Sequence, residues 1–245
     1  MIAPRTCLFF SLLLLSLVRG LAADVRVGLV SYWPLDVDNS GTTPDVASGN
    51  DMTIFNGSNI VPGTNLNAFT FNGTSQYLGI NHSTDNSVNG LPVYNSANGY
   101  TVSLWVKGPP IGASNSVDRY LFTEGSTLSA NPFLALQTRN GATAAASNKL
   151  DVVVRTTGGG TPIVNHLKSG LIVFDNTWHH LAWTDDHGAA KLYVDGNLDP
   201  TSFNYSYTAG SLTLNTTAIG ALVRSTVGGY ATNTVIDDEI GRAHV

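Results

Sequence analysis

The feature that most constrains this chain is a succession of short segments rich in β-branched and aromatic residues, each followed by Gly, Asn, Asp or Pro. This punctuation is typical of strands joined by turns, and no window of about ten residues has the apolar spacing of a helix. Because helices do not alternate with the strands, we expect an all-β antiparallel β-sandwich or barrel of about a dozen strands. The predicted strands are VGLVSYWPLD, AFTFNG, QYLGI, YTVSLWVKG, RYLFTEG, FLALQTR, LDVVVRT, LIVFD, WHHLAWTD, AKLYVDG, SLTLNTTAIG and TNTVIDD.

The N-terminal residues have the pattern of a secretory signal peptide. Arg5 precedes an apolar run from Leu8 to Val18, and the small residues Ala22 and Ala23 offer cleavage sites. The run is too short for a permanent membrane span, and no later run is apolar enough for one. We therefore expect residues 1–23 to be a signal peptide and the rest of the protein to be secreted or held at the cell surface.

Cysteine and charge limit the possibilities further. The single cysteine, Cys7, lies within the predicted signal peptide, so the mature chain has no disulfide and must be held by its core. A chain of roughly 220 residues can bury about 70% of its surface, which is enough for one such core. The formal net charge is −5, and without the basic stripe of a nucleic-acid-binding protein we expect no nucleic-acid partner.

Several segments resemble one family in their order and spacing. They are GLVSYWPLD, DVASGNDMTIFNGS, FTFNGTSQYLGI, YTVSLWVKG, FDNTWHHLAWTDD, AKLYVDG and VIDDEI. Together they resemble the laminin-G-like jelly-roll domains of the concanavalin A-like lectin and glucanase superfamily, over a domain that we place at residues 24–239. The resemblance implies two curved antiparallel sheets and, usually, non-catalytic recognition. It names no ligand, because one fold serves many functions.

The same superfamily contains β-glucanases, so hydrolysis is a rival function. Glycoside hydrolysis needs two carboxyl groups flanking the bond, and similar hydrolases place them on one strand as Glu-x-Asp-x-(x)-Glu. This chain has only two glutamates, Glu124 and Glu239, and neither lies in such a run. Asp185 and Asp186 are adjacent, so we interpret them as turn residues. We expect no enzyme activity, although a pair of distant aspartates stays open.

Two loops rich in aspartate suggest a structural calcium ion. Hard cations prefer carboxylate and carbonyl oxygens on turns, and in similar folds such an ion often joins the first strand region to the last. Here those regions carry PLDVDNSG and VIDDE, so we predict Asp36 and Asp238 as ligands, with Asp45 as a substitute. The alternative is that these aspartates only fix turns through backbone hydrogen bonds.

Sugar binding requires exposed aromatic rings with polar groups beside them. Tyr94, Tyr205, Tyr207 and Tyr230 lie in or beside predicted loops and are the candidate ligand-binding residues. In SFNYSYT the aromatic residues recur at every second position and would share one face. The alternative for this stripe is that it faces the core.

The segment NTWHHLAWTDDHGAAKLYVDGNLD concentrates histidine, aspartate and tryptophan. At a period of two, His179 and His180 point to opposite faces of a strand and cannot chelate one ion together. DDHG then predicts a turn, AKLYVD a partner strand, and DGN a hairpin into a third strand. We interpret the segment as a three-strand meander with no site of its own.

The C-terminal residues EIGRAHV depart from the family pattern, and they match the translation of a common sequencing adapter. We therefore predict that residues 240–245 form a non-native tail on a truncated fragment. The favoured function is a secreted recognition module that binds a glycan or another extracellular ligand within a larger surface protein, with structural calcium as the candidate cofactor. The alternatives are a structural or protein-binding spacer and, third, a polysaccharide hydrolase or lyase.

Overall fold

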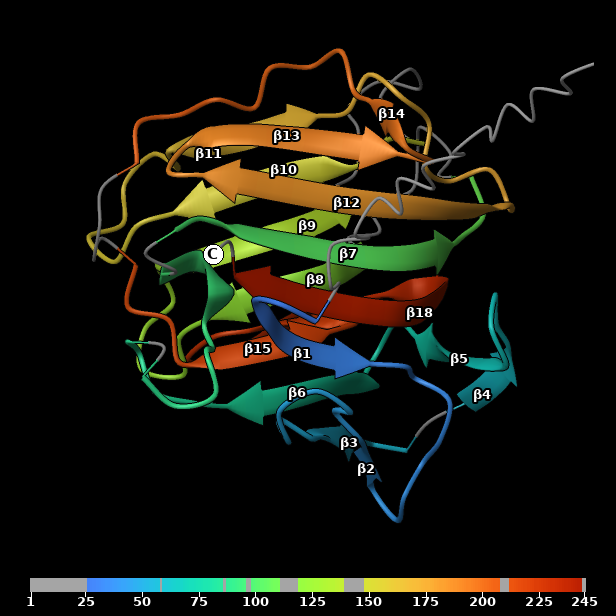
Figure 1. The fold of residues 1–245 in the computed structure, drawn as a ribbon. Helices are drawn as coiled ribbons and strands as arrows, with labels where there is room; N and C mark the ends of the chain where they lie inside the picture. Colours follow the sequence, from blue (N-terminus) through green and yellow to red (C-terminus); the bar gives the residue numbers. More distant parts are fainter. Residues whose placement is uncertain are drawn as a thin grey trace, which may run out of the picture.

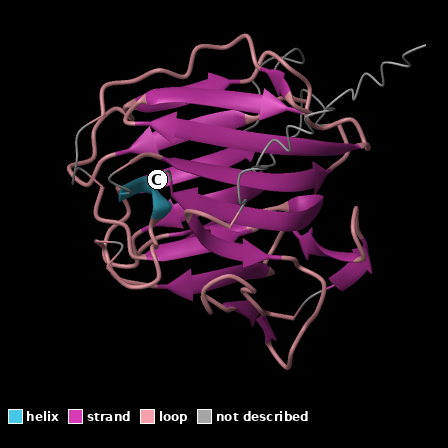
Figure 2. Ribbon diagram, in the orientation of Figure 1, coloured by secondary structure: helices cyan, strands magenta, loops and turns pink. Residues whose placement is uncertain are grey.

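The computed structural model describes residues 26–57, 59–85, 87–95, 98–110, 119–138, 148–207 and 212–243. The predicted signal peptide, residues 1–23, lies outside this part. Figure 2 shows strands and loops throughout the described residues, with one short helical turn, η1 (Val93–Asn95). Nothing helical in the described ranges has the length and apolar character needed to span a bilayer.

The described residues form two large antiparallel sheets. Sheet A has the order β14 (Asn197–Leu198), β13 (Ala189–Val194), β12 (Trp178–Asp186), β7 (Tyr100–Lys107), β18 (Thr232–Ala243), β5 (Asn67–Asn72) and β4 (Asn59–Pro62), and β1 (Leu29–Trp33) also pairs with β18. Sheet B has the order β11 (Val164–Lys168), β10 (Asp151–Arg155), β9 (Phe133–Thr138), β8 (Arg119–Gly125), β15 (Thr216–Ile219), β6 (Tyr77–Asn81), β3 (Met52–Phe55) and β2 (Thr42–Thr43). A separate pair, β16 (Ala221–Val223) and β17 (Val227–Tyr230), completes the fold.

The two sheets stack as the layers of a sandwich, with sheet A in front of sheet B in Figure 1. The predicted all-β antiparallel sandwich is therefore confirmed. The described residues hold more strands than the dozen expected, since the elements numbered up to β18 include very short ones. The shortest, β2 and β14, have two residues each, too few for any period to be recognised in the sequence.

The core lies between the sheets and follows the alternation of each strand. On β7, Val102, Leu104 and Val106 are fully buried while their neighbours are half-buried. The four tryptophans all lie in predicted strands, where we expect core or packing residues: Trp33 and Trp183 are fully buried, whereas Trp105 and Trp178 are half-buried. Burial of such side chains is the main favourable contribution to folding in a chain without disulfides.

One predicted strand is absent from the described structure, the segment LIVFD at residues 171–175. Val173 and Phe174 are fully buried, but the N–H groups of both donate to the carbonyl oxygen of Asn148 and join no sheet ladder. The segment is therefore a buried connection. Its residues are apolar because they are buried. A short buried connection and a short buried strand have the same apolar composition, so the sequence alone does not distinguish them.

The interpretation of Asp185 and Asp186 as turn residues is wrong, because both lie on a strand. β12 continues to Asp186, and Asp185 is 1% exposed. Its carboxylate accepts hydrogen bonds from the hydroxyl of Tyr205 at 2.6 Å and from the backbone N–H of Gly188 at 2.8 Å. Asp185 thus ties the end of a sheet A strand to the loop that carries Tyr205.

The predicted tail begins inside β18, which extends to Ala243. Gly241 pairs with Ser31 on β1, and Glu239 pairs with Trp33. Glu239 is fully buried, and neither of its carboxylate oxygens has a hydrogen-bond partner among the described residues. Burial raises the pKa of Glu239 well above its ordinary value. A carboxylate that is buried without a donor opposes folding. The origin of the tail stays a prediction.

Replacing Glu239 with leucine should raise the free energy of unfolding at pH 7 by more than about 1 kcal/mol, because the desolvated carboxyl is removed. Since the folded pKa of Glu239 is raised, the stability of the unsubstituted protein should fall as the pH rises above the unfolded pKa of about 4.3. Urea unfolding from pH 4 to pH 8 measures both effects. Glu239→Gln should flatten this part of the profile, and an unchanged slope would contradict the placement of Glu239.

Candidate functional site

The β16–β17 hairpin lies on the outer face of sheet B. The carbonyl oxygen of Ala221 accepts a hydrogen bond from the hydroxyl of Thr123 on β8 at 2.8 Å. Hairpin side chains complete two apolar clusters on this face: Ala221 and Val223 pack with Tyr77 and Ala218, and Leu222 packs with Phe133, Ala135 and Val153. The hairpin leaves two recesses on the outer face, one toward β3 and β6 and one toward β9, β10 and β11.

Two glycines allow this close approach. A Cβ atom on Gly125 of β8 would lie 2.1 Å from the carbonyl oxygen of Val223, so the hairpin backbone occupies the space of a side chain. A Cβ on Gly229 would lie 2.0 Å from Cε2 of Tyr120, and Gly229 has a φ of +66°, which favours glycine. The hairpin can therefore sit on sheet B only with glycine at these positions.

The recess toward β3 and β6, named here the aromatic recess, has a volume of about 400 Å³. The rings of Phe55 on β3 and Tyr77 on β6 form its aromatic wall, stacked with centroids 4.3 Å apart and planes within 5°. Tyr77 is nearly buried, whereas Phe55 is 37% exposed. Gly79 lies next to Tyr77 on the same face and adds no side chain, which keeps the recess open.

Polar groups surround this apolar wall. Asn81, Thr127, Thr216 and Arg224 line the recess, so amide, hydroxyl and guanidinium groups lie beside the two rings. Arg224 is held in the hairpin turn, where its Nη1 donates to the carbonyl oxygen of Ala130 at 2.7 Å. An apolar surface with a few fixed polar groups is the usual composition of a small-molecule site.

The second recess, named here the basic recess, has a volume of about 170 Å³. Its lining includes Arg155, Arg224, His166, Gln137 and Phe133. The guanidinium carbons of Arg155 and Arg224 lie 5.8 Å and 5.3 Å from the centroid of the Phe133 ring, within the range of cation–π attraction. Arg224 lines both recesses, so the two adjoin each other.

A buried carboxylate lies beside the basic recess. Asp151 is fully buried and accepts a hydrogen bond from Nδ1 of His166 at 2.9 Å. Burial raises the pKa of Asp151, while the hydrogen bond from His166 and the charges of His166 and Lys168 lower it. The Asp151 carboxylate thus fixes the orientation of the His166 ring.

The structure places three of the four candidate tyrosines away from any exposed platform. Tyr94 is 1% exposed, and its ring contacts those of Tyr100 and Tyr207 at centroid distances of 6.0 Å and 5.4 Å. Tyr205 and Tyr207 are half-buried and pack against the core cluster. The stripe in SFNYSYT therefore faces the core, which is the alternative considered for it.

The fourth candidate, Tyr230, packs beside Tyr77 and is not among the described residues that line the aromatic recess. Its ring centroid is 6.2 Å from that of Tyr77, and it packs against the same apolar cluster. The sequence analysis missed Phe55 and Tyr77. A signal was present, because in QYLGIN the ring of Tyr77 alternates with Leu78, which faces the core, and so points outward.

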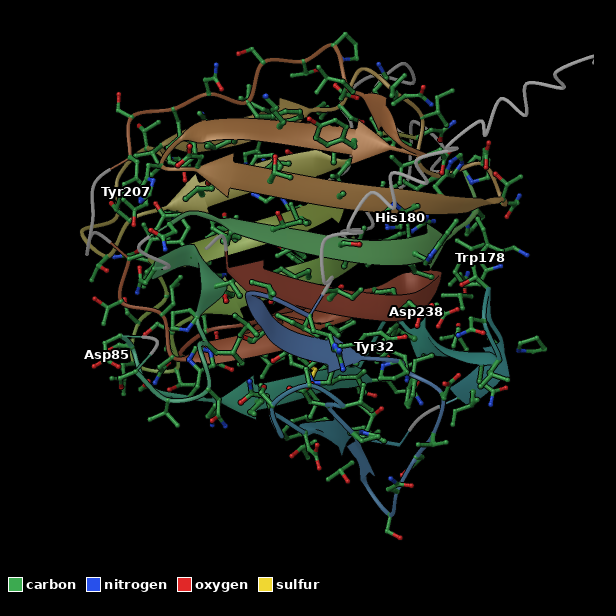
Figure 3. The ribbon with its side chains drawn as sticks, in the orientation of Figure 1. Tyr32, Asp85, Trp178, His180, Tyr207 and Asp238 are labelled. Atoms are coloured by element: carbon green, nitrogen blue, oxygen red, sulfur yellow. The ribbon has the colours of Figure 1, made fainter. Side chains whose placement is uncertain are left out.

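The predicted calcium ligands Asp36 and Asp238 lie in one acidic region, joined by Asp237. Figure 3 shows Tyr32 of β1 beside Asp238, and the Tyr32 hydroxyl donates to that carboxylate at 2.7 Å. Burial is the largest cause that raises the pKa of Asp238, and the charges of Asp237 and Asp36 raise it further. The hydrogen bond from Tyr32 opposes this shift. Asp237 is fully buried, and its Oδ1 has no hydrogen-bond partner among the described residues.

The carboxylates of Asp36, Asp237 and Asp238 meet some but not all of the requirements of a cation site. The unpartnered Oδ1 of Asp237 and the mutual repulsion of three acids favour a positive charge, but no three His, Cys, Asp or Glu side chains in the described ranges converge as a metal site. Asp45 does not fit the role of substitute ligand. Its two oxygens accept bonds from backbone or hydroxyl groups of Tyr32, Ala47, Ser48 and Asn50, so it organises its own loop.

The paired histidines on β12 have separate partners, as their alternation predicts. Nδ1 of His179 lies 2.7 Å from a carboxylate oxygen of Asp195, while Nε2 of His180 lies 2.9 Å from the hydroxyl of Ser103. The predicted meander is also present, since β13 pairs with β12 and β14 pairs with β13. The segment forms part of sheet A and does not join the two recesses.

Both glutamates point away from the outer face of sheet B. Glu124 is fully buried and accepts the backbone N–H groups of Val93 at 2.6 Å and Tyr94 at 3.1 Å, which anchors η1. Burial raises its pKa to about 7, against the opposing effect of these two bonds. Glu239 lies opposite Trp33 of the core.

Comparison with known families gives one match. A family model described as "Concanavalin A-like lectin/glucanases superfamily" matches residues 72–238, which is more than half of the chain. The resemblance derived from the sequence motifs is therefore confirmed. A search of curated proteins found no match.

Comparison with solved structures gives distant neighbours that share the fold. Trypanosoma rangeli sialidase in complex with sialic acid matches with a TM-score of 0.60 and 16% identity, over 89% of this chain and 31% of the sialidase. Domain 4 of the Geobacillus stearothermophilus arabinanase AbnA, in complex with arabinotriose, matches with a TM-score of 0.58 and 19% identity, over 88% and 92%. A structure of botulinum neurotoxin type C, a toxin that interacts with two ganglioside molecules, matches with a TM-score of 0.61 and 12% identity, over 89% and 48%. This chain thus spans about a third of the sialidase.

Substitutions at two adjacent glycines test how closely the β16–β17 hairpin packs against sheet B. Gly229→Ala should lower the free energy of unfolding by about 1 kcal/mol or more, because alanine is strained at positive φ and its Cβ meets the Tyr120 ring. Gly228→Ala is the matched control, because a Cβ there meets nothing within 4 Å. Thermal and urea unfolding of both variants measures the difference, and equal effects would contradict the close approach.

Proposed function

The chain belongs to the concanavalin A-like lectin/glucanases superfamily, and we propose that it is a secreted or surface-held, non-catalytic carbohydrate-binding module. The outer face of sheet B is the binding surface, and the aromatic recess takes a sugar ring. The observation that carries this proposal is the stacked pair Phe55–Tyr77 in a recess with polar groups around it. This geometry supports recognition of a glycan, and its extracellular location is part of the proposal.

The chemistry of the aromatic recess suits a saccharide. A sugar ring presents C–H groups on its faces and hydroxyl groups around its edge. The aromatic wall can pack against the C–H groups, and Phe55 supplies exposed ring surface for it. Asn81, Thr127 and Thr216 offer donors and acceptors to the hydroxyl groups. These groups lie mostly on strands of a rigid sheet, which favours a preformed site.

Two structural neighbours supply independent support. The arabinanase domain is described in complex with arabinotriose, and the botulinum neurotoxin type C structure concerns interaction with ganglioside molecules. The first of these is itself one domain of an extracellular enzyme. At these low identities the neighbours carry only the fold, so the transfer of sugar binding and of secretion to this chain is part of our proposal.

A non-catalytic role is favoured by where the carboxyl groups lie. Hydrolysis requires two of them flanking the bond, and the described lining of the aromatic recess contains no Asp or Glu. Asp151 beside the basic recess is a single carboxylate engaged by His166. Release of reducing ends from a polysaccharide panel would favour the hydrolase alternative over the binding module.

We also propose a structural calcium ion near Asp36, Asp237 and Asp238. Its support is the unpartnered Oδ1 of Asp237 and the raised pKa of Asp238 among neighbouring charges. Oxygen ligands of this kind are those that calcium prefers. The ion would neutralise the acidic region between the loop after β1 and strand β18, far from the chemistry of the recesses.

Phe55→Ala should weaken binding to the best ligand on a glycan array by about tenfold or more, equivalent to about 1.4 kcal/mol, because the exposed ring surface is lost. Tyr193→Ala on β13 of sheet A removes a half-buried ring elsewhere and should leave affinity unchanged. Isothermal titration calorimetry of the three proteins gives the comparison. Equal affinities would refute the recess as the site, and failure of the parent protein to bind any sugar would favour a spacer function.

Calcium should raise the melting temperature of the parent protein, with a stabilisation of about 2.7 kcal/mol when the ion is at 100 times its dissociation constant. Asp237→Asn should abolish this response, whereas Asp186→Asn, at an exposed position on β12, should preserve it. Differential scanning calorimetry with calcium and with chelator measures the shift. No shift in the parent protein would contradict the proposed ion.

A further inference from the structure

We propose that the basic recess binds the carboxylate of an acidic sugar through Arg155 and Arg224. In the same complex, Oε1 of Gln137 accepts a hydrogen bond from a hydroxyl group of that sugar. This inference rests on the proposed sugar-binding function and deepens it, because it assigns the ligand to glycans that carry a carboxylate, for which uronate oligosaccharides are the probe. The ligand then extends across both recesses, with a neighbouring ring against Phe55.

Two cations converge on this recess, and in the described part of the chain no carboxylate pairs with either of them. Arg155 and Arg224 come from β10 and from the hairpin turn, yet both guanidinium groups lie within 6 Å of the same Phe133 ring. Neither arginine forms an ion pair with a carboxylate among the described residues, and the Nε atoms of both are buried without a hydrogen-bond partner. Two like charges at such a site favour an anion between them.

Gln137 adds an observation independent of charge. Its side chain is 2% exposed, its Nε2 is directed to Oδ2 of Asp151 at 3.4 Å, and its Oε1 is buried with no partner in the described structure. An amide oxygen accepts hydrogen bonds but donates none. A sugar hydroxyl would supply the donor that Oε1 lacks, and a carboxylate on the same sugar would supply an anion to the arginines.

The remaining charged groups around the recess do not cancel its positive charge. His166 lines the recess, and its ring is held by a hydrogen bond to Asp151. The Asp151 carboxylate is buried and is not part of the recess lining, and the charge of Lys168 lowers the pKa of Asp151. The recess thus presents Arg155, Arg224 and His166 to a ligand in a protein of net charge −5. An inorganic anion such as sulfate could meet the arginines but offers Gln137 no donor.

Arg224 lines both recesses, so a ligand that passes over this side chain can reach from one recess to the other. One glycan chain can therefore place a neutral ring on the aromatic wall and an acidic ring against the arginines. Stacking in the aromatic recess contributes affinity, and the arginines of the basic recess select an acidic sugar ring over a neutral one. Selectivity of this kind is a difference between two affinities and must be measured as one.

The test compares uronate oligosaccharides with their methyl esters, which keep the sugar and its hydroxyl groups but lose the charge. Glucuronate, galacturonate and mannuronate oligomers are titrated by calorimetry, with sulfated galactose oligomers as a third arm. The parent protein should bind at least one uronate about tenfold more tightly than its ester. Arg155→Gln and Arg224→Gln should each bring the ratio of the uronate affinity to the ester affinity close to one, and Lys191→Gln on β13 should leave that ratio and both affinities unchanged.

Equal affinity for acid and ester, or a preference that survives both arginine substitutions, would overturn the carboxylate assignment. Tight binding of the sulfated oligomers with none of the uronates would also overturn it. These results differ from failure of the sugar-binding proposal, in which esters and acids alike do not bind and Phe55→Ala changes nothing. Melting temperatures of the arginine variants close to that of the parent protein establish that a lost preference does not come from unfolding.

Discussion

The contact on which the proposed site depends is the packing of the β16–β17 hairpin against the outer face of sheet B. The sandwich itself would leave that face as a broad surface of side chains. Because Gly125 and Gly229 have no side chains, the hairpin backbone approaches the sheet closely, and Thr123 bonds to the carbonyl oxygen of Ala221. The hairpin therefore acts as a ridge, and a recess lies on either side of it.

The ridge also explains why the two recesses differ in chemistry. Toward β3 and β6 the outer face carries Phe55 and Tyr77, which form an apolar wall, and toward β9 and β10 it carries Gln137 and Arg155. Arg224 in the hairpin turn belongs to both. A ligand with alternating apolar and acidic features fits such an arrangement better than a small apolar molecule does.

The sequence predicted the class of fold because its strands alternate and because their order resembles a known family. It also predicted that the tryptophans within strands are core or packing residues; Trp33 and Trp183 are buried, while Trp105 and Trp178 are half-buried. It failed where the outcome depends on tertiary contact. LIVFD is apolar because it is covered, and Asp185 is buried because Tyr100 and Tyr205 approach it from other elements. The candidate site was missed for the same reason, since Phe55, Tyr77 and Arg224 meet only after the hairpin folds back.

The central claim is that a sugar binds the outer face of sheet B and not the loops that carry the candidate tyrosines. The most direct measurement is a two-dimensional amide NMR titration with an oligosaccharide that binds. We expect the largest shifts at Phe55, Gly79 and Val227, which line the aromatic recess, with small shifts at Tyr205 and on β12. Shifts concentrated at Tyr205 and Tyr207, or on the outer face of sheet A around Trp105, would contradict the claim.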